Sequence, residues 1–505
     1  MTNPLYDALV APLAERRDDV LIDAVGAGMS GAELYGRAMR LAAALAGAGL
    51  VPGDRLAVQI EKSPQALALY LGAVAAGVVF LPLNTAYTPE EVDYFVGNSR
   101  AAMLVGDPAK AEALHAVAAR HGARFQTMDG AGAGSLPDLA AEAGDFTPAA
   151  RNPDDLAAIL YTSGTTGRSK GAMLSQSNLL SNAEVLVREW RFTKDDVLLH
   201  ALPIFHTHGL FVASNVVLRS GGRMIFLPGF KLDQVIELLP RATTMMGVPT
   251  FYTRLLNDPR FDRDLVGHMR LFTSGSAPLL AETHRQFEDR TGHRILERYG
   301  MTETNMNTSN PYDGERRAGT VGFPLPGVEL KITDPATGAT LPDGEPGMIE
   351  VRGPNVFLGY WEMPEKTREE LREDGFFLTG DIGVIDPDGY VSIVGRQKDL
   401  IITGGFNVYP KEIELILDEQ PGVLESAVVG VPHPDFGEGV VAVLVAAPDS
   451  APDLVRIRTA LEQSLARFKQ PKHIAVLPEL PRNTMGKVQK NLLRKELESV
   501  FALQR

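Results

Sequence analysis

The chain of 505 residues contains no cysteine. This absence excludes disulfide scaffolds, zinc sites with thiolate ligands and thiol nucleophiles, so any covalent chemistry must use another atom. Long basic runs and mixed basic and aromatic patches are also missing, and the formal net charge is -14. A nucleic-acid partner is therefore not expected.

Long apolar runs are missing as well, because glycine or charge interrupts each of them well before roughly 18 residues. The N-terminus has no positively charged segment followed by an apolar one, as a signal peptide would. Together these absences predict a soluble cytoplasmic protein with no membrane partner.

The length is too great for one hydrophobic core, and at roughly 150 residues per domain it predicts several domains. Helical segments alternate with short apolar runs over residues 30–150 and again over 175–300, which predicts two doubly wound α/β layers. Short strands broken by Gly, Pro and Asp over 318–396 indicate a small β-barrel or a twisted antiparallel sheet.

The last hundred or so residues predict a compact α+β lid that forms a unit of its own. The polar stretch 395–399 lies between a strand and a new apolar run, and it marks the boundary. The predicted domains are therefore residues 1–397 and 398–505.

The stretch 161–171 is a run of hydroxyls, glycines and two cations that follows the apolar residues 156–160. Backbone N–H groups freed by glycine, hydroxyls and a lysine are the donors that a polyphosphate requires. The stretch is not the common P-loop, because Gly164 is followed five positions later by Ser169 instead of glycine. On composition alone, a flexible surface loop is the alternative.

Further stretches join this loop in a fixed order along the chain. They are 206–209 (HTHG), 274–278 (SGSAP), 298–303 (RYGMTE), 379–381 (TGD), 395–399 (GRQKD), 404–410 (GGFNVYP) and 481–487 (PRNTMGK). With the loop, they resemble the adenylate-forming superfamily of acyl-CoA synthetases, luciferases and peptide-synthetase adenylation domains. The resemblance covers nearly the whole chain.

The resemblance implies a two-step reaction that uses ATP, Mg²⁺ and CoA. A carboxylate attacks the α-phosphate of ATP to give an acyl-adenylate and pyrophosphate, and the thiol of CoA then attacks the acyl carbon. Such chemistry depends on positioning and charge neutralisation more than on a protein nucleophile. The missing cysteine is therefore no obstacle.

The resemblance also assigns residues to the nucleotide. Those expected at its phosphates are Thr162, Ser163, Gly164, Thr165, Thr166, Gly167 and Lys170. Those expected around the adenine are Ser276, Ala277, Pro278 and Tyr299, and Gly300 and Met301 are also expected to bind the nucleotide. Asp381 would accept both ribose hydroxyls and Arg396 would face the ribose or the α-phosphate, while Thr302 would donate to phosphate. Glu303 matches the carboxylate that holds magnesium.

Other matches concern the lid and its motion. Lys487 matches the lysine that reaches the reacting carboxylate and α-phosphate, and the resemblance implies acylation of its amine as a form of regulation. Lys398 falls at the hinge about which the lid rotates between the half-reactions. After rotation the segment Gly404, Gly405 and Phe406 would line the CoA tunnel. His206 lies between the acyl and nucleotide sites, where gating is favoured over general-base action.

The acid is predicted from a departure from the family pattern. Many members carry glycine directly before the Tyr-Gly-Met/Leu-Thr-Glu motif, whereas this chain carries Arg298, and Arg254 lies in the stretch that usually lines the acyl pocket. Two arginines there would fit a second carboxylate, with Ser276 as a further donor. Malonate, and with it methylmalonate, is the expected acid, because the chain is similar to malonyl-CoA synthetases. For Arg254, a helix-surface ion pair is the alternative.

Other functions stay open at this point. They are a medium-chain or aryl acyl-CoA synthetase, a peptide-synthetase adenylation module with a separate carrier protein, and a non-catalytic nucleotide-binding protein of the same fold. The two pocket arginines disfavour the first, and the joint presence of Lys487, Glu303 and Asp381 disfavours the last.

Overall fold

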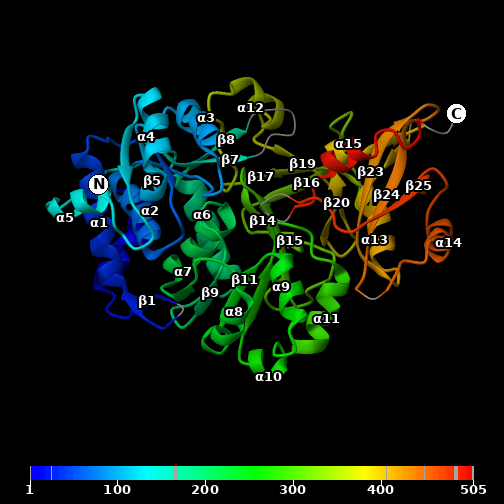
Figure 1. The fold of residues 1–505 in the computed structure, drawn as a ribbon, viewed down its shortest axis with the longest axis horizontal. Helices are drawn as coiled ribbons and strands as arrows, with labels where there is room; N and C mark the ends of the chain where they lie inside the picture. Colours follow the sequence, from blue (N-terminus) through cyan, green and yellow to red (C-terminus); the bar gives the residue numbers. More distant parts are fainter. Residues whose placement is uncertain are drawn as a thin grey trace.

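The computed structural model describes residues 2–23, 25–162, 169–404, 406–448, 450–482 and 487–502. In Figure 1 the C-terminal residues, coloured orange to red, lie on the side of the molecule opposite the N-terminus. In the part of the chain that is described, no helix is long and apolar enough to cross a membrane.

Among the described residues the largest sheet has nine strands. In spatial order they are β15 (Phe323–Pro324), β14 (Asn305–Ser309), β13 (Leu296–Met301), β12 (Leu271–Ser274), β11 (Thr244–Gly247), β9 (Val197–His200), β10 (Arg223–Phe226), β1 (Asp19–Ile22) and β2 (Gly28–Ser30). The strands from β13 to β1 run parallel, and the strands beyond them at either edge are antiparallel. Parallel strands place their carboxyl ends at one edge, where ligands bind in open α/β sheets.

A second sheet contains most strands from the first third of the chain. In spatial order these strands are β18 (Gly359–Tyr360), β8 (Lys170–Ser175), β7 (Leu156–Thr162), β4 (Val79–Pro82), β3 (Arg55–Gln59), β5 (Met103–Gly106) and β6 (Arg124–Thr127). From β7 to β6 they are parallel, whereas β8 pairs with β7 as an antiparallel hairpin. The two predicted α/β layers are confirmed.

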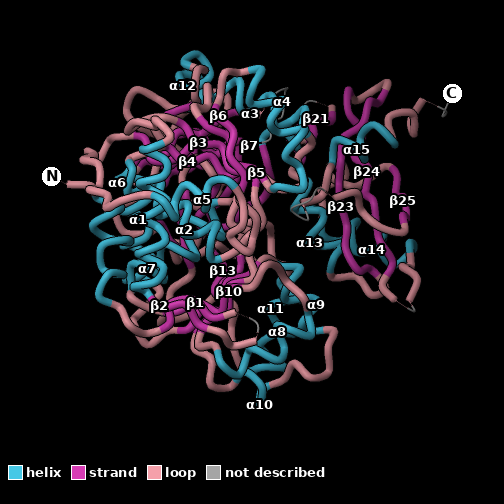
Figure 2. Tube along the Cα trace, turned by 60° about the vertical axis from the view of Figure 1, so that its left-hand side comes forward, coloured by secondary structure: helices cyan, strands magenta, loops and turns pink. Residues whose placement is uncertain are grey.

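Helices cover these sheets (Figure 2). They are α1 (Gly31–Gly47), α2 (Pro64–Ala76), α3 (Pro89–Ser99), α4 (Ala111–Arg120), α5 (Ser135–Glu142), α6 (Gln176–Glu189), α7 (Asn215–Ser220), α8 (Leu232–Leu238), α9 (Pro249–Leu256), α10 (Arg263–Val266) and α11 (Ala281–Thr291). The first begins at a capping box, in which Ser30 and Glu33 satisfy each other's backbone N–H groups.

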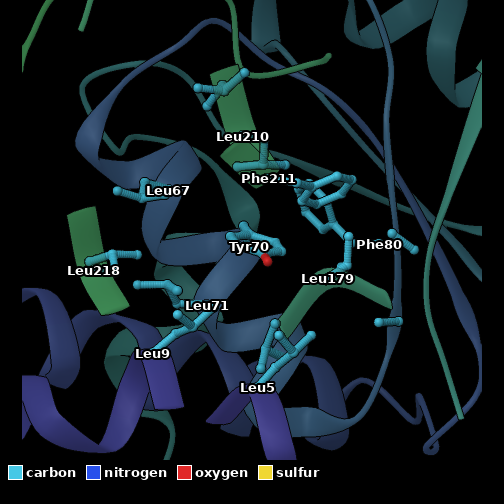
Figure 3. Packing of buried hydrophobic residues seen from close by; sticks show 14 of the residues in the cluster. Leu5, Leu9, Leu67, Tyr70, Leu71, Phe80, Leu179, Leu210, Phe211 and Leu218 are labelled. Atoms are coloured by element: carbon cyan, nitrogen blue, oxygen red, sulfur yellow. The ribbon is translucent and has the colours of Figure 1, made fainter. Parts of the chain in front are cut away.

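The core between the two sheets is built around α2, whose residues from Ala66 to Ala76 are all buried. Figure 3 shows Tyr70 of this helix close to Phe80 and Phe211, and the centroids of their rings lie 5.4 Å and 5.8 Å from that of Tyr70. Phe211 belongs to the π-helical segment His208–Ser214, every residue of which is buried. The segment that follows the 206–209 motif is therefore fixed in the core.

The region 318–396 forms an open sheet, so the barrel alternative is wrong and the twisted antiparallel sheet is confirmed. Its strands, in spatial order, are β16 (Glu329–Thr333), β17 (Gly347–Arg352), β19 (Phe377–Ile385) and β20 (Val391–Arg396). All neighbours are antiparallel, and the described strands at the two edges, β16 and β20, do not pair with each other. The helix α12 (Pro364–Glu370) lies between β18 and β19 in the chain.

The C-terminal residues form a separate domain, as predicted. Its sheet contains β22 (Phe406–Val408), β21 (Ile401–Thr403), β24 (Gly437–Ala446), β23 (Val423–His433) and β25 (His473–Leu477), and its helices are α13 (Pro410–Asp418), α14 (Leu454–Ser464) and α15 (Lys490–Glu496). Among the described strands of this sheet, only β25 pairs in parallel, and its partner is β24. Strands β23, β24 and β25 lie side by side in Figure 2. The exact boundary at 397/398 stays a prediction.

Candidate active site

The predicted phosphate-binding stretch begins and ends on the hairpin of β7 and β8. Thr162 is the last residue of β7 and pairs with Lys170, the first residue of β8. The backbone therefore holds the two predicted phosphate residues at either end of the stretch close together. The residues between them that carry predictions, Ser163, Gly164, Thr165, Thr166 and Gly167, lie outside the described residues.

Lys170 and Glu303 belong to a compact polar cluster. The Lys170 ammonium donates to both carboxylate oxygens of Glu370 on α12, at 3.1 and 3.2 Å, and lies 4.1 Å from the ring centroid of Tyr360. The Tyr360 hydroxyl is 2.6 Å from Glu370 and 3.0 Å from the buried Glu303 carboxylate. Burial raises the pKa of Glu303, and the Lys170 charge partly offsets this effect.

The predicted ribose residues meet across the antiparallel pair of β19 and β20. In this register Asp381 faces Arg396, and the Arg396 Nε lies 3.0 Å from one Asp381 oxygen. The Tyr299 hydroxyl donates to the other oxygen at 2.6 Å. Both partners are charged or strongly polar, so the carboxylate is held in one orientation.

Gly300 has a structural reason to be glycine. A Cβ at this position would lie 1.8 Å from the carbonyl oxygen of Asn305, because β13 and β14 turn tightly here. The neighbouring Met301 ends β13 and is half-buried, as is Thr302. Glycine at position 300 therefore permits the tight turn, and Tyr299 and Glu303 lie before and after that turn in the chain.

The predicted adenine segment follows β12. Ser276 has φ +70°, a left-handed conformation uncommon for a residue other than glycine. Its hydroxyl lies 3.2 Å from Nδ1 of His208. Ala277 is half-buried and Pro278 is exposed. The left-handed Ser276 backbone thus directs the hydroxyl toward His208.

Arg298 on β13 is 3% exposed. Its Nε and Nη2 atoms are buried and have no hydrogen-bond partner among the described residues. The guanidinium lies against the backbone of Gly275, where a Cβ would be 2.3 Å from Nη1. Burial lowers the pKa of Arg298 to about 9. A buried cation with unpaired N–H groups is costly, so the site favours an anionic ligand.

Two histidines lie beside this cation. His208 is buried, and burial together with the Arg298 charge lowers its pKa well below the usual value. Burial also lowers the pKa of His206 to about 4, and the Lys487 charge adds to the effect. Nε2 of each ring is buried without a hydrogen-bond partner among the described residues. Both imidazoles are therefore neutral at pH 7.

Arg254 differs from Arg298 in its surroundings. It lies in the last turn of α9 and is exposed. The structure therefore supports a buried binding position for Arg298 and not for Arg254, whose contact with substrate stays a prediction.

Comparison with known proteins places the chain in a family. The AMP-binding enzyme model matches residues 11–361, and the model of the AMP-binding enzyme C-terminal domain matches residues 412–487. The chain belongs to the AMP-binding enzyme family. The polar groups described above come from three sheets, and they include the residues that the family resemblance predicted for the active site.

Three proteins of known name are similar to this family member. A malonate–CoA ligase of Arabidopsis thaliana is 36% identical over 90% of this chain and 79% of its own length. A sulfoacetate–CoA ligase of Cupriavidus necator is 37% identical over 88% of each chain. The crystal structure of ATP-bound MatB from Rhodopseudomonas palustris is 58% identical, covers 99% of this chain and 100% of its own, and has a TM-score of 0.96.

The backbone of the chain as a whole is more similar to ATP-bound MatB than to apo MatB. Apo MatB has the same identity and coverage, yet its TM-score is 0.88. Lys487 faces the site in this structure: burial and Arg396 lower its pKa, whereas Asp381 and Glu303 raise it.

The residues predicted for the hinge and the CoA path belong to the start of the predicted lid domain. Lys398 is exposed in the 3₁₀ turn Gln397–Asp399, and Asp399 is paired with Arg494 of α15 at 2.7 Å. Gly404 has φ +57°, and Phe406 is 55% exposed and stacks on Phe468 at 4.6 Å. Gly405 lies outside the described residues. Their roles stay predictions in this family member.

Sequence-based prediction missed three residues of the site. Tyr360 and Glu370 join the Glu303 cluster from β18 and α12, and nothing in their local sequence marks them. His208 was visible in the 206–209 motif, but no pattern in the sequence showed that it meets Ser276. All three depend on contacts between residues far apart in the chain.

Proposed function

We propose that the chain is an AMP-forming acid–thiol ligase that converts malonate, ATP and CoA to malonyl-CoA, AMP and pyrophosphate. The observation that carries malonate is the buried Arg298 guanidinium, two nitrogens of which pair with no described residue. A second carboxylate would supply the missing acceptors through charge-assisted hydrogen bonds. The named activity of the Arabidopsis relative supports this choice.

In the first step Arg298 holds the distal carboxylate of malonate, and Ser276 and His208 stand beside it. An oxygen of the other carboxylate attacks the α-phosphorus of ATP, a new O–P bond forms, and the bond to pyrophosphate breaks. Lys487 neutralises the negative charge that develops at the attacking and α-phosphate oxygens. Asp381, held by Tyr299 and Arg396, accepts from the ribose and fixes the nucleotide.

In the second step the lid rotates about Lys398, and the Gly404–Phe406 segment lines the path of CoA. The thiol of CoA releases its proton to solvent and its sulfur attacks the acyl carbon, a C–S bond forms, and the bond between the acyl carbon and the phosphate oxygen of AMP breaks, so that AMP leaves. His206, neutral and next to Lys487, separates the two half-sites and acts as a gate.

Magnesium fits the phosphate side only together with substrate. The described residues contain no group of three or more His, Asp or Glu side chains that could hold a metal ion. Mg²⁺ commonly binds one or two carboxylates and completes its shell with phosphate oxygens and water. Glu303 would therefore hold the ion with the phosphates of ATP, and the ion would neutralise phosphate charge.

Two smaller points extend the proposal. Acylation of Lys487 would remove its charge and stop adenylation, which mass spectrometry of protein purified from its native cells would detect. Because ATP and CoA are supplied inside cells, we expect the reaction in the cytoplasm.

The test is pyrophosphate release from purified protein with ATP, Mg²⁺, CoA and a panel of acids. Malonate should give the highest kcat/KM, methylmalonate a lower value, and octanoate and benzoate the lowest. Preference for octanoate over malonate would overturn the dicarboxylate assignment, and absence of pyrophosphate–ATP exchange with every acid would overturn catalysis.

A further inference from the structure

Lys62 is a buried lysine that the proposed reaction does not use. It lies between β3 and α2 and is 8% exposed. Its ammonium donates to Nδ1 of His200 at 2.9 Å and to the carbonyl oxygens of His200 and Leu202, each at 2.8 Å. It also lies 4.3 Å from the centroid of the Phe226 ring. All three N–H groups therefore have acceptors that belong to one short segment.

The contact with His200 decides which ring nitrogen carries hydrogen. His200 is the last residue of β9 and is fully buried. Because Nδ1 accepts from Lys62, the hydrogen is on Nε2, which donates to the carbonyl oxygen of Gly209 at 2.9 Å. The Ser214 hydroxyl donates to the same carbonyl, also at 2.9 Å.

These hydrogen bonds close the segment 201–208 at both ends. Lys62 holds its start through the carbonyls of His200 and Leu202, and His200 holds its end through Gly209. The segment folds back on itself, since a Cβ at Gly209 would lie 1.9 Å from the carbonyl oxygen of Pro203. Directly after it, Leu210 and Phe211 are anchored in the core (Figure 3).

A small cavity lies against the segment next to Lys62. Pro203, Ile204 and Phe205 line this cavity of about 50 Å³ together with Lys62. Dispersion contacts are lost where neighbouring atoms are absent, so the hydrogen bonds of Lys62 add to the packing of Ile204 in the core. The inner side presents His206 and His208 to the site.

We propose that Lys62 is a positioning residue for the acyl side of the active site. By clamping both ends of the segment 201–208, it keeps His208 against Ser276 and beside Arg298. This inference rests on the proposed function, because the acid pocket is where it acts. It predicts that loss of the clamp weakens malonate recognition and leaves the ATP side unchanged.

The experiment compares Lys62→Met with Asp196→Asn. Lys62→Met removes all three donors at the carboxyl end of β9. Asp196→Asn weakens the ion pair with Arg270, 2.6 Å long, just before the same strand begins. Both substitutions should lower Tm. Only Lys62→Met should raise the KM for malonate, by about tenfold or more, with the KM for ATP changed less than twofold.

A spectroscopic measurement tests the clamp without reference to activity. In protein with ¹⁵N-labelled histidine, His200, assigned through His200→Gln, should show the Nε2–H tautomer, and Lys62→Met should change that signal. If Lys62→Met does not fold, His200→Gln gives a second kinetic test, because it removes one of the three acceptors of Lys62 and the imidazole that holds Gly209.

The outcomes separate the two proposals. If Lys62→Met raised the KM for malonate and the KM for ATP equally, the positioning role would be overturned. A KM for malonate in Lys62→Met no higher than that in Asp196→Asn would also overturn it. A wild-type enzyme that prefers another acid would overturn the proposed substrate, while the tautomer would still test the clamp.

Discussion

The site has two parts that differ in how their charged groups are paired: the phosphate side, around Lys170, and the acyl side, around Arg298. On the phosphate side Lys170, Glu370, Tyr360 and Glu303 already satisfy one another. On the acyl side the Arg298 guanidinium is buried with two nitrogens unpaired by any described residue. The protein completes one set of interactions by itself and leaves the other for the substrate.

This difference has a consequence for selectivity. With Lys170 at the phosphates, as predicted, ATP would exchange an existing ion pair for a new one, and its net gain there would be modest. An acid with a second carboxylate relieves an existing penalty, and an acid without one leaves the cation unpaired. Discrimination between acids therefore arises from the free protein, before any contact with ATP.

The largest effect is expected where the two sides meet, at Lys487. Replacing it with alanine should lower the rate of adenylation by about 10²- to 10³-fold or more, because charge at the α-phosphate loses its partner. Thioester formation from supplied malonyl-adenylate should stay nearly unchanged. Measuring the two half-reactions separately checks this, and equal losses in both would point to misfolding.

Arg298→Met should act on the acyl side alone. Without the cation, kcat/KM for malonate should fall by about 10²- to 10³-fold, whereas the KM for ATP should hold. In the absence of ligand, Tm should rise, because removal of an unpaired buried charge stabilises the folded state by about 1–3 kcal/mol.

Arg254→Met is the matched control for that substitution. Arg254 is exposed, so its replacement should change neither Tm nor malonate turnover appreciably. A loss comparable to that of Arg298→Met would show that both arginines bind the acid, as the sequence alone predicted.

Glu370→Gln should have a smaller effect, and on the phosphate side. Without its negative charge, residue 370 binds the Lys170 ammonium more weakly, so the phosphates of ATP no longer compete with a carboxylate for it. The KM for ATP should therefore fall about two- to fivefold, as expected for one partly exposed ion pair. Glu369→Gln on the same helix is the control, because Glu369 pairs with Lys366. A raised KM for ATP would show that the pair positions Lys170 productively.

The last effect is on stability and not on activity, and it is the dependence of the unfolding free energy on pH. The folded-state pKa of His206, about 4, is below the unfolded value near 6.5, so the unfolded chain takes up a proton first. The stability from this neutral ring is present above pH 6.5 and is lost as pH falls toward 4. His206→Gln should flatten the profile of unfolding free energy over that range, and an unchanged slope would contradict this prediction.

Local sequence patterns predicted the two α/β layers well, because helical segments that alternate with short apolar runs are typical of doubly wound layers. The motif order predicted which residues gather, and Asp381, Arg396 and Tyr299 do meet. The predicted barrel was wrong because short antiparallel strands have the same sequence pattern in a closed barrel and in an open sheet, so the pattern does not show whether the edge strands pair. Glu370 and Lys62 escaped prediction because their partners lie 200 and 138 positions away in the chain.

The contact between Gly275 and Arg298 constrains how this enzyme can change over evolution. A Cβ at position 275 would lie 2.3 Å from Nη1, so a larger residue there would displace the guanidinium from its present position. A lineage that moves toward apolar acids would therefore disturb the arginine by filling position 275 even before it lost Arg298. In the reverse direction, glycine at position 275 gives a newly acquired arginine its place.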